Sequence, residues 1–178
     1  MKKMIVSAIA FVFGVWGASA SELTSISVSF KESAPKDIFV IRNIGNCHVK
    51  PMELKINLAA SQGQLIFDPT ASGAGVEVFQ PFEVTDGRQL VSKLPRVRDG
   101  DDQLKLTFLS LPPKWNFAFT IDVDDTLIDS KLGQIRVANA EIKGAVVSMQ
   151  LQDKSPTLRA TFSSDAVAVL RRVPCGSS

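Results

Sequence analysis

The chain has 178 residues, with 20 Lys and Arg against 18 Asp and Glu, one His and a formal net charge of +2. Hydrophobic residues make up 45% and charged residues 21%, which indicates a folded globular chain rather than a disordered one. So small a net charge argues against nucleic acid as a partner, and one His with two Cys excludes multi-histidine and thiolate zinc sites.

The first twenty residues have the three-part layout of a secretory signal peptide. Residues 1–3 (MKK) are basic, residues 4–16 are apolar, and residues 17–20 (GASA) supply the small residues of a cleavage site. The alternative, an uncleaved membrane anchor, needs about 30 Å of apolar helix, whereas residues 4–16 would span only about 20 Å. We therefore expect cleavage after Ala20, a mature domain at 21–178 with no membrane span, and a periplasmic or extracellular location.

An oxidising location bears on Cys47 and Cys175, which can pair outside the cytoplasm. The bond would enclose about 128 residues and contribute about 4 to 5 kcal/mol if the geometry permits. Two unpaired thiols are the alternative, because Cys175 lies in a Gly-Ser tail close to the chain end. A Cys-His nucleophile is disfavoured, since the neighbours Cys47 and His48 would point in opposite directions on a strand.

From Ser21 onward the main hydrophobic period is two, which is typical of strands with one buried and one solvated face. Ile26, Val28 and Phe30, for example, alternate with serines. The alternation is clearest at 25–30, 53–58, 103–108 and 116–123, and further strands are expected at 37–42, 65–67, 76–84, 135–137, 145–151, 158–162 and 167–173. Residues that favour turns, mainly Gly, Pro, Asn and Asp, separate these runs.

About ten short strands without an amphipathic helix predict an all-β fold. The expected architecture is an antiparallel β-sandwich, either a jelly-roll or an immunoglobulin-like Greek key, and the sequence leaves the strand order open. No internal repeat or low-complexity linker divides the chain. Residues 21–178 are therefore expected to form a single domain.

Acidic residues gather in two places, one with Asp99, Asp101 and Asp102 and the other with Asp122, Asp124, Asp125 and Asp129. The second group lies in the phrase FTIDVDDTL, which resembles the first motif of the haloacid dehalogenase phosphotransferases. That resemblance implies that Asp122 attacks phosphorus and Asp124 acts as acid/base, with magnesium. Only 53 residues follow Asp125, too few for the parallel sheet of that family. A magnesium-dependent phosphatase is therefore the weaker hypothesis.

Calcium is the alternative chemistry for these carboxylates. The ion takes roughly six to eight oxygen ligands, which clustered carboxylates, backbone carbonyls and water can supply. On a strand Asp122 and Asp124 would share the solvated face, and the other acidic loop would converge with them if both lie at the same pole. The expected ligands are Asp99, Asp101, Asp102, Asp122, Asp124 and Asp125. The competing interpretation is that Asp fills turns at the rim of a sandwich, because the EF-hand spacing is absent.

The aromatic residues Phe79, Phe82 and Trp115 allow two interpretations. On the surface they would stack on sugar rings, as in a carbohydrate-binding module. The favoured expectation places all three in the core, with Pro81 marking a bulge in an edge strand.

Several phrases occur together in the expected mature domain. They are SAPKD at 33–37, IRN at 41–43 leading to Gly45 and Cys47, SGAGVEVFQPF at 72–82 and FTIDVDDTL at 119–127. Their combination resembles bacterial proteins labelled after the sponge aggregation factor core protein, over roughly residues 30–160. The resemblance implies an extracellular β-rich module with an adhesion-like, calcium-dependent role and no catalytic residues. A secreted, non-enzymatic module that contacts a protein or an extracellular polysaccharide surface is therefore the main hypothesis.

The signal segment also carries the excess charge. Lys2 and Lys3 are the only charged residues among the first twenty, so 18 basic and 18 acidic residues remain in 21–178. The expected mature domain is neutral overall, with its acidic charge concentrated in two turns.

Overall fold

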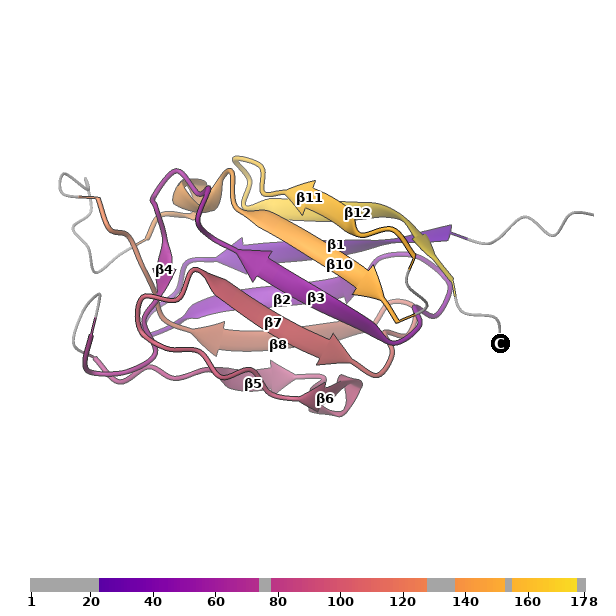
Figure 1. The fold of residues 1–178 in the computed structure, drawn as a ribbon, viewed down its shortest axis with the longest axis horizontal. Coiled ribbons are helices and arrows are strands. Elements are labelled where there is room, and N and C mark those ends of the chain that lie inside the picture. The colour runs from indigo at the N-terminus through magenta and orange to yellow at the C-terminus, as the bar shows by residue number, and fades with distance from the viewer. Residues whose placement is uncertain (1–22, 74–77, 128–136, 153–154, 176–178) are drawn as a thin grey trace, which may run out of the picture.

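The structure is a computed structural model that describes residues 23–73, 78–127, 137–152 and 155–175. Two five-stranded antiparallel sheets pack face to face (Figure 1). The first sheet consists of β1 (Leu23–Lys31), β2 (Asp37–Asn43), β5 (Glu83–Asp86), β8 (Asn116–Ile121) and β12 (Val167–Pro174). The second consists of β3 (Met52–Asn57), β6 (Val91–Lys93), β7 (Gln103–Phe108), β10 (Val146–Leu151) and β11 (Leu158–Thr161).

Three smaller elements complete the described fold. A two-stranded ribbon of β4 (Ile66–Phe67) and β9 (Val123–Asp124) lies at one end of the sandwich. The short 3₁₀ helices η1 (Arg88–Leu90) and η2 (Asn139–Ile142) lie in connections between strands. The described ranges contain no α-helix, so the all-β prediction is confirmed.

The strand order, which the sequence left open, is β12-β1-β2-β8-β5 in the first sheet and β11-β10-β3-β7-β6 in the second. Several neighbours are far apart in the sequence, such as β2 beside β8 and β3 between β10 and β7. Every pairing in the two sheets is antiparallel. The antiparallel β-sandwich predicted from the period of two is therefore confirmed.

The alternating apolar residues of the strands meet between the two sheets and form the core. Ile26 and Val28 of β1 are fully buried and Phe30 is 4% exposed, as the alternation predicts. Aromatic rings gather near the end that carries β4 and β9. Phe39 lies 5.0 Å from Phe119 and 6.3 Å from Phe67, measured between ring centroids.

The segment predicted as one strand at 76–84 departs from expectation. Residues 76 and 77 lie outside the described residues, residues 78–82 are not paired as a strand, and β5 begins at Glu83. Phe82 is partly buried and packs against Phe119 with ring centroids 4.8 Å apart, so its core placement is confirmed in part. Phe79 is 68% exposed and Trp115 is 48% exposed, so the core expectation is wrong for both. Both lie outside paired strands, where alternation does not determine which side chain is buried.

Cys47 and Cys175 form a disulfide, with their Cα atoms 5.7 Å apart, so the predicted pairing is confirmed. The bond joins the segment after β2 to the end of β12. Next to the disulfide, Val49 forms antiparallel β-bridges with both Leu111 and Cys175. This end of the sandwich is therefore closed covalently.

The predicted signal peptide at 1–20 lies outside the described residues and remains a prediction. Within the described ranges, no helix has both the length and the apolar character needed to cross a membrane.

Candidate metal centre

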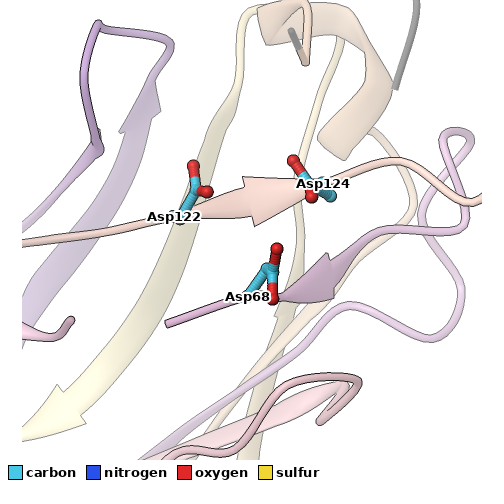
Figure 2. A group of neighbouring side chains, drawn as sticks. All are labelled: Asp68, Asp122 and Asp124. Atoms are coloured by element: carbon cyan, nitrogen blue, oxygen red, sulfur yellow. The ribbon is translucent and has the colours of Figure 1, made fainter. Parts of the chain in front are cut away.

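Three aspartates meet at the end of the sandwich that carries β4 and β9 (Figure 2). One carboxylate oxygen from each of Asp68, Asp122 and Asp124 lies within 4.8 Å of those of the other two. Asp68 directly follows β4, Asp122 lies between β8 and β9, and Asp124 is the last residue of β9. We call this group the Asp triad.

The β4–β9 ribbon explains why these three side chains converge. Phe67 and Val123 lie opposite each other in the ribbon and are buried, which anchors it to the aromatic part of the core. The Asp68 amide donates to the Asp122 carbonyl over 3.1 Å and extends the pairing by one residue. Pro69 follows and lacks an amide hydrogen, so the pairing ends there and the Asp68 carboxylate stays beside β9.

The triad is more buried than strand alternation suggests. Asp68 and Asp124 are each 1% exposed, and Asp122 is half-buried. The expectation that Asp122 and Asp124 share a solvated face is therefore wrong for Asp124. The chain at Gln80 runs alongside the site, where its amide donates to the Pro69 carbonyl and its carbonyl accepts from the Asp122 amide.

Burial and repulsion between carboxylates raise the pKa values of two members of the triad, Asp68 and Asp122. Burial is the largest cause that raises the pKa of Asp68 to about 7, followed by its contact with the Asp124 carboxyl and by the negative charges nearby. Burial and then the charge of Asp124 raise the pKa of Asp122 to about 7. These carboxyls therefore favour a proton or a cation between them.

The contact between Asp68 and Asp124 is unfavourable when both carboxylates are ionised, because neither has a proton to donate to the other. Their side chains lie in hydrogen-bonding contact, yet each ionised carboxylate can only accept. No donor from the described part of the chain faces the buried Oδ2 of Asp68. A shared proton or a bound cation would remove the repulsion between the two carboxylates.

A cavity of about 410 Å³ opens beside the triad and is lined by Asp122 and Asp124. Glu32, Asp37 and Gln80 also line it, and the buried Oε1 of Gln80 has no partner in the described part of the chain. Burial raises the pKa of Asp37 to about 8; the Ser33 amide opposes that rise, and the charge of Asp122 adds to it. No Lys or Arg is among the described residues that line the cavity. The cavity is thus rich in oxygen acceptors and suits a cation.

Both acidic clusters predicted from the sequence do lie at this end. The Phe67 amide donates to the Asp101 carbonyl over 2.8 Å, and the Gly100 amide donates to the Phe67 carbonyl over 3.0 Å. Only Asp122 and Asp124 of the six predicted ligands belong to the triad.

The other predicted ligands hold their own loops. Asp99 accepts hydrogen bonds from the amide and the hydroxyl of Thr70, and Asp101 accepts one from the Arg98 amide. Asp125 accepts a hydrogen bond from the Leu127 amide, and Asp102 uses its carbonyl to accept from Leu58. Turn formation, the competing interpretation, describes these contacts well.

Sequence reasoning missed Asp68. The signal available in the sequence was its position directly after the predicted strand at 65–67 and before Pro69. An isolated Asp gives no cluster in the sequence, so only the pairing of β4 with β9 reveals it.

Comparison with protein-family models and with curated proteins finds no match for the chain. The phrase FTIDVDDTL lies in antiparallel pairings, since β8 pairs with β2 and β5 and β9 pairs with β4. The doubly wound parallel sheet that the phosphatase hypothesis needs does not occur among the described residues.

Proposed function

We propose that the chain is an exported β-sandwich module that acts by binding rather than by catalysis, with a calcium ion held by the Asp triad. The observation that carries the proposal is the buried contact of Asp68 with Asp124, in which no described donor faces Asp68 Oδ2. A divalent cation would neutralise the repulsion and allow all three carboxylates to stay ionised.

The donor set favours calcium among the common cations. Carboxylate and amide oxygens select hard cations, and the described residues at the site offer no imidazole or thiolate. Calcium accepts irregular coordination by roughly six to eight oxygens, whereas magnesium requires a nearly octahedral arrangement. The half-buried Asp122 and the adjoining cavity leave room for water to complete the shell.

Three further features support an adhesion-like role outside the cytoplasm. The resemblance to the aggregation factor core-like proteins implies such a role. The disulfide suits an oxidising compartment. Val78 lines the cavity, and its neighbour Phe79 is 68% exposed, which offers an apolar contact beside the ion. The partner would be a protein or an extracellular polysaccharide surface.

Calorimetric titration of calcium chloride into chelator-treated protein tests the ion site. We expect a dissociation constant of about 10⁻⁴ to 10⁻³ M, the range of extracellular calcium modules. Asp68→Asn should abolish the binding heat. Asp102→Asn, which removes the same charge at the same end but outside the triad, should preserve it. The absence of binding at millimolar calcium would contradict the assignment of a calcium ion to the Asp triad.

Aggregation of beads coated with the protein tests the role separately. Beads should clump in calcium and disperse on chelation, and beads coated with Asp68→Asn should remain dispersed in both conditions. Beads that bind calcium but never clump would contradict the adhesion-like role while leaving the ion site intact.

A further inference from the structure

The end of the sandwich opposite the Asp triad carries a groove of about 480 Å³ that contains two consecutive arginines. Arg171 and Arg172 line it together with Leu23, Ser25 and Ile44. β1 runs between the two ends, and its nine residues span roughly 27 Å. The groove is therefore separate from the proposed calcium site and does not depend on it.

A β-bulge in β12 places both arginine side chains on the exposed side. Ile26 of β1 lies opposite Leu170 and Thr24 lies opposite Val173, so Ser25 faces two residues of β12 instead of one. Leu170 and Val173 are fully buried, whereas both arginines between them are exposed. On a regular strand one of two consecutive side chains would point into the core.

The bulge holds Arg172 in a backbone conformation that L-residues disfavour. Its φ is +58°, in the left-handed region where glycine is the usual occupant. Residues kept in that region concentrate at functional sites, because selection for stability alone would replace them. Neither Arg171 nor Arg172 takes part in the ion pairs of the described residues, so both charges are available to a ligand.

Two further cationic side chains belong to neighbouring segments at this end. Lys114 Nζ donates to the Ile44 carbonyl over 2.9 Å, which fixes that ammonium group beside the groove. Arg42 of β2 is exposed and lies opposite Ser27, two residues along β1 from Ser25.

Three large apolar side chains at this end of the sandwich are exposed to solvent. Leu23 is 44%, Ile44 is 42% and Trp115 is 48% exposed. The Asn43 amide donates to the Trp115 carbonyl over 3.1 Å, which places Trp115 next to the strand that leads into Ile44.

Beneath these residues, the fully buried Asn43 side chain accepts from the Thr24 hydroxyl over 2.9 Å and from the Gly45 amide over 3.1 Å. Its amide group also donates to the carbonyls of Cys47 and Leu111. These four bonds and the disulfide give the groove a rigid floor.

We propose that this groove binds the carboxylate groups of an acidic polysaccharide. The planar guanidinium group matches a carboxylate with two parallel hydrogen bonds, which favours Arg over Lys at such sites. The exposed Leu23 and Ile44, which line the groove, offer surface for the apolar faces of sugar rings.

A second copy of the chain fits this groove less well. Its concentrated negative charge lies at the Asp triad, where Asp68 and Asp124 are each 1% exposed. Recessed carboxylates cannot reach the guanidinium groups of another molecule. The triad of a second copy is therefore not the charge that the groove recognises.

The test measures binding of an alginate oligosaccharide, a polyuronate, against a maltodextrin of matched length. EDTA is present throughout, so the result does not depend on the calcium site. We expect binding of alginate alone, and a loss of at least about tenfold in affinity in the double variant Arg171→Gln with Arg172→Asn. Asn replaces Arg172 because it tolerates a positive φ.

The matched control is Lys55→Gln with Lys105→Gln, a pair that faces across β3 and β7 on the other sheet and removes the same charge. The control should bind alginate as the wild type does. Equal losses in the two double variants would overturn the proposal, because they indicate nonspecific attraction. So would equal binding of maltodextrin, or no binding of alginate. Arg171→Gln alone, with an unchanged melting temperature, provides the same test if the double variant does not fold.

Analytical ultracentrifugation tests the rival occupant. Association of the wild type with itself, abolished by Arg171→Gln, would overturn the polysaccharide assignment in favour of a second copy. A monomer at all concentrations, together with alginate binding, supports it. Alginate binding in a protein that fails to bind calcium would contradict only the calcium assignment in the proposed function, on whose polysaccharide partner this inference rests.

Discussion

The two ends of the sandwich hold opposite charges in opposite ways. At one end, Asp68 and Asp124 are buried and in contact with each other. At the other, a bulge turns Arg171 and Arg172 outward. A buried charge must be neutralised inside the fold, whereas an exposed charge keeps its hydration and stays available. The acidic end therefore suits an ion that belongs to the structure, and the basic end suits a ligand that binds and leaves.

The two ends of the sandwich also differ in the interactions that connect their chain segments. At the basic end the disulfide joins the chain after β2 to the end of β12. At the acidic end the ribbon of β4 and β9 is only two residues long in each strand, and the triad lies across it. A bound cation would supply there the cross-link that the disulfide supplies at the other end.

The largest expected effect comes from breaking the covalent closure. Cys47→Ala with Cys175→Ala should lower the free energy of unfolding by about 4 to 5 kcal/mol, because the bond closes a long loop and restricts the unfolded chain. Urea denaturation of the variant and the wild type measures the difference. Reduction of the wild type by dithiothreitol should give a similar loss. A loss below about 1 kcal/mol would show that the bond adds little to the basic end.

The next effect is the pH dependence of calcium stabilisation. The pKa values of Asp68 and Asp122 are raised to about 7 in the folded chain. Without calcium the folded chain thus keeps protons that the unfolded chain loses between about pH 4 and 7, and its stability falls as the pH rises through that window. Calcium replaces those protons. At pH 8, calcium at 100 times its dissociation constant should stabilise by about 2.7 kcal/mol.

The shift should shrink towards zero as the pH falls through 7 to 5, because protons then compete with the ion for the triad. Melting scans with calcium and with EDTA at each pH measure it. Asp102→Asn should reproduce the wild-type profile, and Asp68→Asn should show no calcium shift at any pH. Equal shifts at pH 5 and pH 8 in the wild type would contradict triad binding.

Most of the fold was predictable because period-two alternation operates wherever a strand has one buried face. Residues 25–30 and 116–121 show this, since their alternate apolar side chains form the core. The strand order was not predictable, because β2 beside β8 depends on contacts between residues about 80 positions apart. Short β6 was missed, since three residues cannot display a period.

The candidate site was predictable only in part. The local phrase that contains Asp122 and Asp124 signalled acidic chemistry, but Asp68 lies more than 50 residues earlier and joins it only through the β4–β9 pairing. The prediction that Trp115 is buried was wrong. Trp115 lies outside the strands, where hydrophobic alternation does not indicate which large apolar side chains are buried. The bulge at Arg171 and Arg172 was also invisible, since it is a property of the register between β12 and β1.

The smallest expected effect tests whether Arg172 is kept in an unfavourable backbone conformation because its side chain contacts the ligand. Arg172→Gly relieves a left-handed conformation that costs about 1 to 2 kcal/mol in a residue with a Cβ. Glycine also makes the unfolded chain more flexible, which lowers the stability of the folded state by about 0.5 to 1 kcal/mol. The net result should be a gain of up to about 1.5 kcal/mol in urea denaturation, together with weaker alginate binding. Arg171→Gly is the matched control, since Arg171 lacks a positive φ and its replacement should only destabilise. A gain in stability with a loss of binding would show that Arg172 is kept for its guanidinium group. Loss of both would mean that the Arg172 side chain supports the bulge through its own packing.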